Sequence, residues 1–170
     1  MSKSAYLRIG ELLVSEGLLT NEQLKEALSW RSRTKIRFGE VLTELGFVRE
    51  ENVIAALAKQ FDQPMIELSN FNPKFEAVEL VPQQFAIDHI CLPLWTDEMG
   101  LHIAISDPLD IPTIDELSSM AKLRVNVHLA TPTDIRRAIN RSYTAGSSRA
   151  PKARHTKRQK DRDQLLELLA

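Results

Sequence analysis

Two stretches decide the fold: RIGELLVSEGLLTNEQLKEALSWR at residues 8–31 and RFGEVLTELGFVREENVIAALAKQ at residues 37–60. Arg8 recurs as Arg37, 29 positions later, and glycines and apolar residues recur with it. A fixed internal period predicts two copies of one supersecondary unit, which bury a shared face or share a ligand. The repeat therefore predicts a duplicated helical subdomain over residues 1–63.

Each copy has the pattern of a helix pair. In the first copy, apolar residues at helical spacing precede Gly17, which allows the positive φ common after helix ends. Thr20, followed three residues later by Gln23, is a capping-box pattern that opens the second helix. The second copy repeats the plan around Gly46 but has Arg49 where Thr20 stood. We therefore expect four helices in two pairs.

After Pro64 the pattern changes to short apolar runs that alternate with helical stretches. A turn at 97–100, in which Gly100 can take a positive φ, joins two of these runs. The expected strands span residues 65–68, 90–95, 101–105 and 124–129. The expected helices span residues 75–80, 83–87, 111–120 and 133–143, the last capped by Thr131 or Thr133. The predicted class is α+β, with a small mixed α/β subdomain over residues 64–145.

Charge is unevenly distributed along the 170 residues, although the formal net charge is only −1. Residues 1–63 hold nine basic and nine acidic groups, residues 64–145 hold six and eleven, and residues 146–170 hold seven and three. Residues 146–170 also have little to bury, which predicts a disordered basic tail. This balance argues against nucleic-acid binding by the rest of the chain.

Several function classes lack the residues they need. Cys91, the single cysteine, lies in an apolar run and is expected to be a buried thiol. The sequence contains no run of ~20 apolar residues, so it does not predict membrane insertion. The sequence has no nucleophile elbow, and His89, His102, His128 and His155 lack metal-ligand spacing. We expect a cytoplasmic protein that is not an enzyme and has no catalytic residue, metal or cofactor.

The repeat offers groups that suit an anionic ligand with planar bases. Arg8 and Arg37 can form bidentate bonds to phosphate or to guanine. Gly10 and Gly39 can let backbone approach a ligand. Four apolar residues could form a surface on which a planar base lies, and one amide could bond to a base edge. The apolar residues are Leu24, Leu28, Val53 and Leu57, and the amide is that of Gln60. The alternative is that the apolar positions are core and the glycines serve helix packing alone.

The duplicated order Arg-hydrophobic-Gly, Leu, Gly, Leu, Leu, Gln resembles the N-terminal domain of type II secretion and type IV pilus assembly ATPases. In that family it is the MshE-type domain, a receptor for cyclic di-GMP. The resemblance places nucleotide-binding residues on both copies: Arg8, Ile9, Gly10, Leu24, Leu28 and Arg31, then Arg37, Phe38, Gly39, Val53, Leu57 and Gln60. Arg31 stands where the motif has Gln, and Phe38 where it has a smaller aliphatic residue.

The resemblance continues into ISDPLD at residues 105–110. There Asp107 could accept from guanine N1–H and the exocyclic amine, or else cap the turn before Pro108. The resemblance implies a cyclic di-GMP-binding regulatory module whose partner is a secretion or pilus protein, either an ATPase or a membrane platform. No Gly-x-x-x-x-Gly-Lys-Ser/Thr loop occurs, so no ATPase activity is expected. The alternative function is a ligand-free adaptor that docks to a platform protein.

Overall fold

The computed structural model describes residues 3–144, in which eight helices and three strands form an α+β fold. The chain divides into two compact units, and the division falls between Ala56 and Leu57. The predicted boundary at residues 63 and 64 stays a prediction, and the predicted tail at 146–170 lies outside the described residues. Within 3–144, no helix is both long and apolar enough to cross a lipid bilayer.

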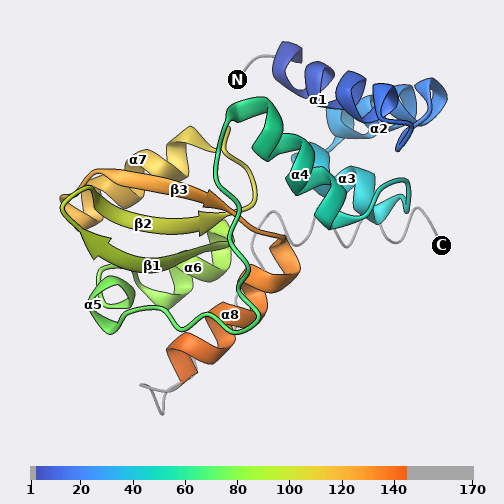
Figure 1. The fold of residues 1–170 in the computed structure, drawn as a ribbon. Helices are drawn as coiled ribbons and strands as arrows, with labels where there is room; N and C mark the ends of the chain where they lie inside the picture. The colour runs from blue at the N-terminus through green and yellow to red at the C-terminus, as the bar shows by residue number, and fades with distance from the viewer. Residues whose placement is uncertain (1–2, 145–170) are drawn as a thin grey trace. The chain divides into compact units, whose positions relative to one another are not determined.

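The helical repeat forms two helix pairs, as predicted (Figure 1). The first pair is α1 (Lys3–Ser15) and α2 (Asn21–Arg33), and the second is α3 (Phe38–Glu44) and α4 (Glu50–Phe61). The last residues of α4 belong to the second compact unit. The duplication in the sequence is therefore a duplication of a helix–turn–helix element.

Two local features start and stop these helices where the sequence predicts. Gly17 and Gly46 both have a φ of 72°, which ends the first helix of each pair at little steric cost. The capping box is also confirmed: Thr20 Oγ1 accepts from the Gln23 N–H at 3.1 Å, and Gln23 Oε1 accepts from the Thr20 N–H at 2.9 Å. Local chemistry thus accounts for the turns of the repeat.

A mixed sheet of three strands forms the centre of the second unit. The strands β1 (Cys91–Asp97), β2 (Gly100–Ile105) and β3 (Val125–Leu129) lie in the order β1-β2-β3. β1 and β2 are antiparallel, whereas β2 and β3 are parallel, as a hairpin followed by a helical crossover requires. Gly100 has a φ of 118° and begins β2, so the predicted turn is confirmed.

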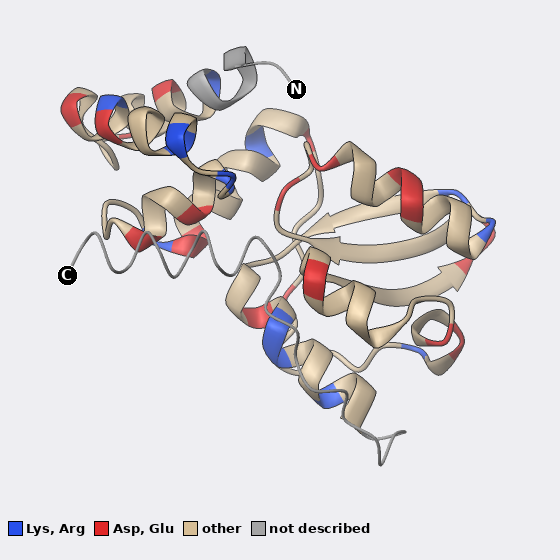
Figure 2. Ribbon diagram, turned by 180° about the vertical axis from the view of Figure 1, so that it is seen from behind, with Lys and Arg blue, Asp and Glu red and all other residues tan. Residues whose placement is uncertain are grey.

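Four helices accompany the sheet: α5 (Phe75–Val78), α6 (Gln83–His89), α7 (Ile111–Ala121) and α8 (Pro132–Thr144). Figures 1 and 2, which view the chain from opposite sides, show α6 and α7 on the same face of the sheet. Thr131 is the cap of α8, because its hydroxyl accepts from the Asp134 N–H at 3.1 Å. Because α6 and α7 lie on the same face, the helices do not cover the two faces of the sheet equally.

The core of the second unit comes from alternate strand residues. Leu101, Ile103 and Ile105 are completely buried on β2 and share one face. The thiol of Cys91 is buried, as predicted. The alternation leaves His102 half-buried, and Ala104 shares the opposite face with it.

One predicted strand is wrong. Residues 65–68 form no strand, and only Met65 makes a parallel bridge, to Leu129. The Leu129 N–H donates to the Pro64 carbonyl at 2.7 Å, and the Ile66 N–H donates to the Leu129 carbonyl at 2.9 Å. Apolar alternation at 65–68 indicated extended backbone correctly, but a ladder needs a partner strand along its whole length, and β3 ends at Leu129.

Candidate functional site

The first motif copy exposes only part of what the sequence assigned to it. Arg8 is exposed on α1 and Leu28 is half-buried on α2, whereas Ile9, Gly10 and Leu24 are buried. A base cannot stack on a side chain that the protein already covers. In the first copy, Arg8 and the exposed parts of Leu28 and Arg31 are therefore the groups that a ligand can reach directly.

The second copy is more deeply buried than the first. Arg37 is only 8% exposed and precedes α3 as its N-cap residue, and Phe38, Val53 and Leu57 are all buried. Gln60 is half-buried, and its Oε1 is a buried acceptor that takes no hydrogen bond from the described residues. A buried acceptor without a donor costs free energy. Gln60 is therefore the residue of this copy that gains most from a donor on a ligand.

The motif glycines have an evident packing role. A Cβ placed on Gly10 would lie 2.2 Å from Leu24 Cδ1, and one on Gly39 would lie 2.9 Å from Val53 Cγ1. Both copies thus use the missing side chain to bring the second helix of the pair close to the first. This is the packing alternative that the sequence left open, and a direct approach of either glycine to a ligand stays a prediction.

Arg31 has a structural contact of its own at the end of α2. Its Nη1 donates to the Thr34 carbonyl at 3.2 Å, and Thr34 in turn donates from its N–H to the Trp30 carbonyl at 3.1 Å. A cation at a helix C-terminus is favourable because carbonyl groups there lack intrahelical donors. Contact between Arg31 and a base stays a prediction.

Asp107 caps a turn, as the alternative interpretation held. Its Oδ1 accepts from the Leu109 N–H at 2.9 Å, and its carbonyl accepts from the Asp110 N–H at 3.2 Å. The residue is buried and belongs to the second compact unit, as Leu57 and Gln60 do. Its contact with a base stays a prediction.

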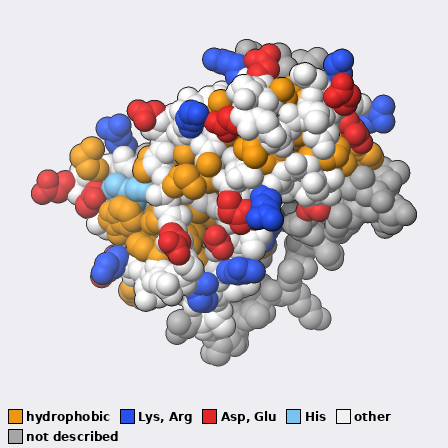
Figure 3. All heavy atoms as spheres, turned by 45° about the vertical axis from the view of Figure 1, so that its right-hand side comes forward, with side chains coloured by type: hydrophobic (Ala, Val, Ile, Leu, Met, Phe, Trp, Pro, Cys, Tyr) orange, Lys and Arg blue, Asp and Glu red, His pale blue; other side chains and the backbone are white. Residues whose placement is uncertain are grey.

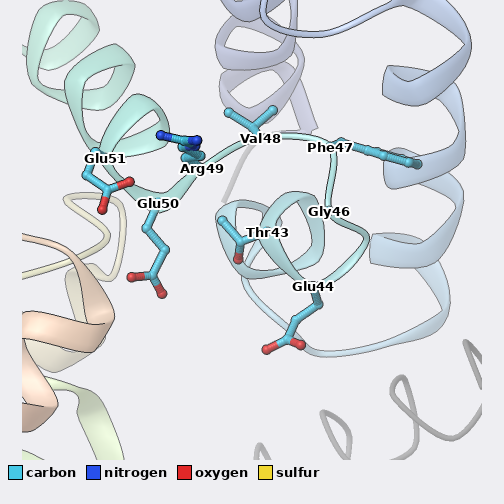
Figure 4. Close-up of a pocket in the computed structure, with 8 residues that line it drawn as sticks. All are labelled: Thr43, Glu44, Gly46, Phe47, Val48, Arg49, Glu50 and Glu51. Atoms are coloured by element: carbon cyan, nitrogen blue, oxygen red, sulfur yellow. The ribbon is translucent and has the colours of Figure 1, made fainter.

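A concavity of about 820 Å³ lies beside the turn between α3 and α4 (Figure 4). None of the predicted site residues lines it. The lining residues are Thr43, Glu44, Gly46, Phe47, Val48, Arg49, Glu50 and Glu51. The carboxylates of Glu44 and Glu50 point to the same open side of the turn. Three glutamates against one arginine oppose an anionic ligand, so this concavity does not suit a dinucleotide.

Sequence reasoning missed a polar cluster on the sheet. His102 and His128 were expected to be isolated, but His102 Nδ1 lies 2.9 Å from His128 Nε2 and His102 Nε2 lies 3.0 Å from Asp97 Oδ1. Strand register was the signal needed, because residues 26 positions apart become neighbours only once β2 and β3 pair. Among residues 3–144, no group of three or more His, Cys, Asp and Glu side chains could hold a metal ion.

Comparison with known proteins identifies relatives over most of the chain. The family model of the MshEN domain matches residues 61–149. The chain is 32% identical over 136 residues to the type IV pilus assembly ATPase PilB of Myxococcus xanthus, and 28% identical over 140 residues to that of Thermus thermophilus. Both matches cover 80% of this chain but only 24% and 16% of the two ATPases.

Solved structures share the fold. A structure of MshE with cdg matches at a TM-score of 0.68 and 31% identity, over 79% of this chain and 98% of that one. The N-terminal domain of XpsE matches at a TM-score of 0.71 and 22% identity, over 84% of this chain and 98% of that one. The fold is therefore shared by both, and the sequence likeness is greater to MshE.

Proposed function

Because the chain belongs to the MshEN domain family, found at the N-terminus of type II secretion and type IV pilus assembly ATPases, we propose that it binds cyclic di-GMP and regulates such a system. The module acts in the cytoplasm by binding rather than by catalysis. Its partner is an ATPase or a membrane platform protein of the secretion or pilus machinery.

One observation carries this proposal. The MshE structure was obtained with cdg, which we take to be cyclic di-GMP, and this chain covers 98% of it at 31% identity. A ligand with two phosphates and two guanines matches a motif that occurs twice with an arginine in each copy. The family model itself begins at residue 61, after the repeat, so the assignment of the ligand to Arg8 and Arg37 is part of the proposal.

Burial suggests unequal parts for the motif residues. Arg8 is exposed and meets a phosphate or a guanine edge without rearrangement. Arg37 is buried at the start of α3 and makes no side-chain capping bond there, so a ligand reaches it less directly than Arg8. Gln60 offers a buried acceptor to a guanine N–H, which removes an energetic cost that the free chain carries.

Calorimetric titration of the full chain with cyclic di-GMP tests the proposal, with cyclic di-AMP and GTP as competing ligands. We expect saturable binding of cyclic di-GMP alone. Arg8→Ala should weaken it by about tenfold or more, because a hydrogen bond to a charged group contributes ~1.5–3 kcal/mol. Arg33→Ala is the matched control, since Arg33 is also exposed in the helical unit but lies outside the motif. Equal affinity of the two variants would contradict the assignment.

The adaptor alternative also has a specific observation in its favour. Gly10 and Gly39 pack against Leu24 and Val53, so helix packing alone explains four motif positions. In that case the repeat is a scaffold and the chain binds a platform protein without a ligand. Capture of the platform protein by wild type and Arg8→Ala alike, unchanged by cyclic di-GMP, together with no calorimetric heat, would favour the adaptor.

A further inference from the structure

A chain of hydrogen bonds crosses all three strands on one face of the sheet. Asp97 at the end of β1 contacts His102 Nε2 at 3.0 Å, and His102 Nδ1 contacts His128 Nε2 at 2.9 Å. Trp95 stacks on His102, with ring centroids 4.5 Å apart and planes 14° from parallel. We name Asp97, His102 and His128 the histidine relay. Figure 3 shows histidine at the surface among hydrophobic side chains on one face of the molecule.

The register of the sheet assembles the relay. Trp95 is the Cα partner of His102 across the antiparallel pair, and Ala104 is the partner of His128 across the parallel pair. Residues two apart on a strand share a face, so His102 and His128 project to the same side. The relay therefore exists only while β3 stays paired with β2.

Hydrogen bonding determines which nitrogen carries each proton. Asp97 accepts from the Met99 N–H at 2.8 Å and from Trp95 Nε1–H at 3.2 Å, so its carboxylate acts as an acceptor and is ionised. Desolvation alone raises the pKa of Asp97, but the hydrogen bonds outweigh it and hold that pKa below its ordinary value. His102 must then donate from Nε2 and accept at Nδ1 from His128 Nε2–H. The lone pair left on the two rings is at His128 Nδ1.

The relay accepts one extra proton but not two. With one, either His102 Nδ1 or His128 Nε2 still has a lone pair that accepts from the other ring, so the bond between the rings and the bond from His102 Nε2 to the Asp97 carboxylate both persist. With two, His102 Nδ1 and His128 Nε2 both carry hydrogen at a separation of 2.9 Å, so a hydrogen bond becomes a repulsive contact. Burial, and then the positive charge of His102, lower the pKa of His128 below its ordinary value.

The surroundings add to this effect. A concavity of about 470 Å³ lies against both histidines, and Arg124 is the charged residue that lines it. Its other lining residues are uncharged: Gln63, Pro64, Pro108, Ile114, Val125, Asn126 and Val127. Arg124 opposes a second positive charge, and Asp97 is the carboxylate that the relay contacts among the described residues. Coulombic repulsion between the two imidazoliums is therefore not neutralised on the β3 side.

β3 is the strand that can separate from the sheet. It is the edge of the sheet, and beyond β2 its described backbone partners are Pro64 and Ile66, both at Leu129. Val125, Asn126, Val127 and His128 are all half-buried. Loss of the His102–His128 bond therefore acts where the sheet has the fewest other contacts.

From this geometry we propose that the histidine relay is a proton-sensitive contact that holds β3 against β2 at neutral pH. The His102–His128 bond breaks when both rings are protonated, and the end of β3 then separates from β2. Opening exposes the β3 edge beside the 470 Å³ concavity. The proposal does not rest on the proposed function, because none of the relay residues is among the predicted ligand residues.

The pH window follows from His128. Its folded pKa lies below the unfolded value of 6.5, so its contribution to stability is fully present above pH 6.5 and is lost as the pH falls below it. We expect the urea midpoint of the full chain to fall as the pH drops from about 7 to about 5. Imidazole NMR should show His128 titrating below its ordinary value of 6.5, and the ring signals of His102 should move with that step because the two rings share a hydrogen bond.

His128→Gln is the decisive variant, because a Gln amide can still donate to His102 Nδ1 but cannot be protonated. It should lose most of the acid-induced decline in urea midpoint. His89→Gln is the control: His89 lies on α6 and its Nδ1 contacts Thr113 Oγ1 at 2.9 Å, so the acid sensitivity of the relay should remain. Trp95 fluorescence in a Trp30→Phe chain reports the stacked His102 locally, and acid should change it in that chain but much less once His128→Gln is added.

Two results would overturn the proposal. One is a His128 ring in the wild-type chain that titrates at or above its ordinary value, with no response of the His102 signals to that step, which needs no variant to fold. The other is an equal loss of stability on acidification in wild type and His128→Gln. If His128→Gln does not fold, the NMR titration of the wild type decides alone.

Discussion

Arg31 has a structural role at a motif position where the other copy has an amide. It stands in the first motif copy where the second has Gln60, and its guanidinium bonds the Thr34 carbonyl at the end of α2. An amide can both donate to and accept from a base edge, whereas a guanidinium only donates. The two copies are therefore chemically unequal even though their backbones repeat.

We predict that Arg31→Gln raises the affinity for cyclic di-GMP by about tenfold, the equivalent of one added hydrogen bond of ~1.4 kcal/mol. The same change should lower stability slightly, since the bond to Thr34 is lost. Calorimetry and urea unfolding measure the two effects separately. Arg33→Gln, two residues along and exposed, should change neither. An affinity that falls on Arg31→Gln would show that the arginine itself binds the ligand.

Gly10 is the residue with the least room for a side chain in the first copy. We predict that Gly10→Ala lowers the free energy of unfolding by about 1–3 kcal/mol, because the new methyl meets Leu24 Cδ1 at 2.2 Å. The gain in helix propensity, up to ~1 kcal/mol, offsets part of this. Adding Leu24→Val, which shortens the clashing side chain, should restore stability. If Gly10→Ala alone is neutral in urea unfolding, the packing role of this glycine is wrong.

At the scale of elements, the capping box gives the start of α2 two reciprocal hydrogen bonds. Thr20→Ala should cost ~1 kcal/mol in the free energy of unfolding, because it removes the acceptor for the Gln23 N–H. Lys25→Ala, at an exposed position within α2, should cost nothing. A comparison of urea midpoints at one pH makes the measurement. Equal midpoints for the two variants would contradict the capping role.

At the scale of the whole molecule, the predicted site residues are divided between the two compact units. Arg8, Arg37 and most motif residues belong to the first, whereas Leu57, Gln60 and Asp107 belong to the second. A ligand that binds only the folded chain stabilises it by mass action, by about 2.7 kcal/mol at a hundredfold excess over the dissociation constant. A loss of this ligand-induced stabilisation, or of affinity, after a substitution in the second unit would show that this unit takes part in binding.

Asp107→Asn makes that test. The amide oxygen of Asn can still accept from the Leu109 N–H, so the turn should persist while the charge is lost. We expect the affinity for cyclic di-GMP to fall by about tenfold, since a carboxylate is the better acceptor for guanine N–H groups. Asp110→Asn, at the N-cap of α7, is the control and should leave affinity unchanged. Unchanged affinity of Asp107→Asn would confine the site to the repeat.

Local signals in the sequence determined the repeat, its four helices, the glycine turns at Gly17 and Gly46 and the capping box at Thr20. They also determined the hairpin at Gly100 and the α+β class. Each of these depends on residues within a few positions of one another, where steric and hydrogen-bonding preferences act directly. The predicted strand at 65–68 failed because β3 ends at Leu129, so only Met65 has a partner residue to pair with.

Only the tertiary structure decided which motif residues are covered and which far-apart side chains meet. Leu24, Val53 and Leu57 match an apolar surface for a base in sequence, but helix packing buries them. His102 and His128 have no sequence pattern in common, but strand register brings their nitrogens within 2.9 Å. The physical reason is the same for both. Burial and contact are set by packing between elements, and the spacing of residues along one element does not specify that packing.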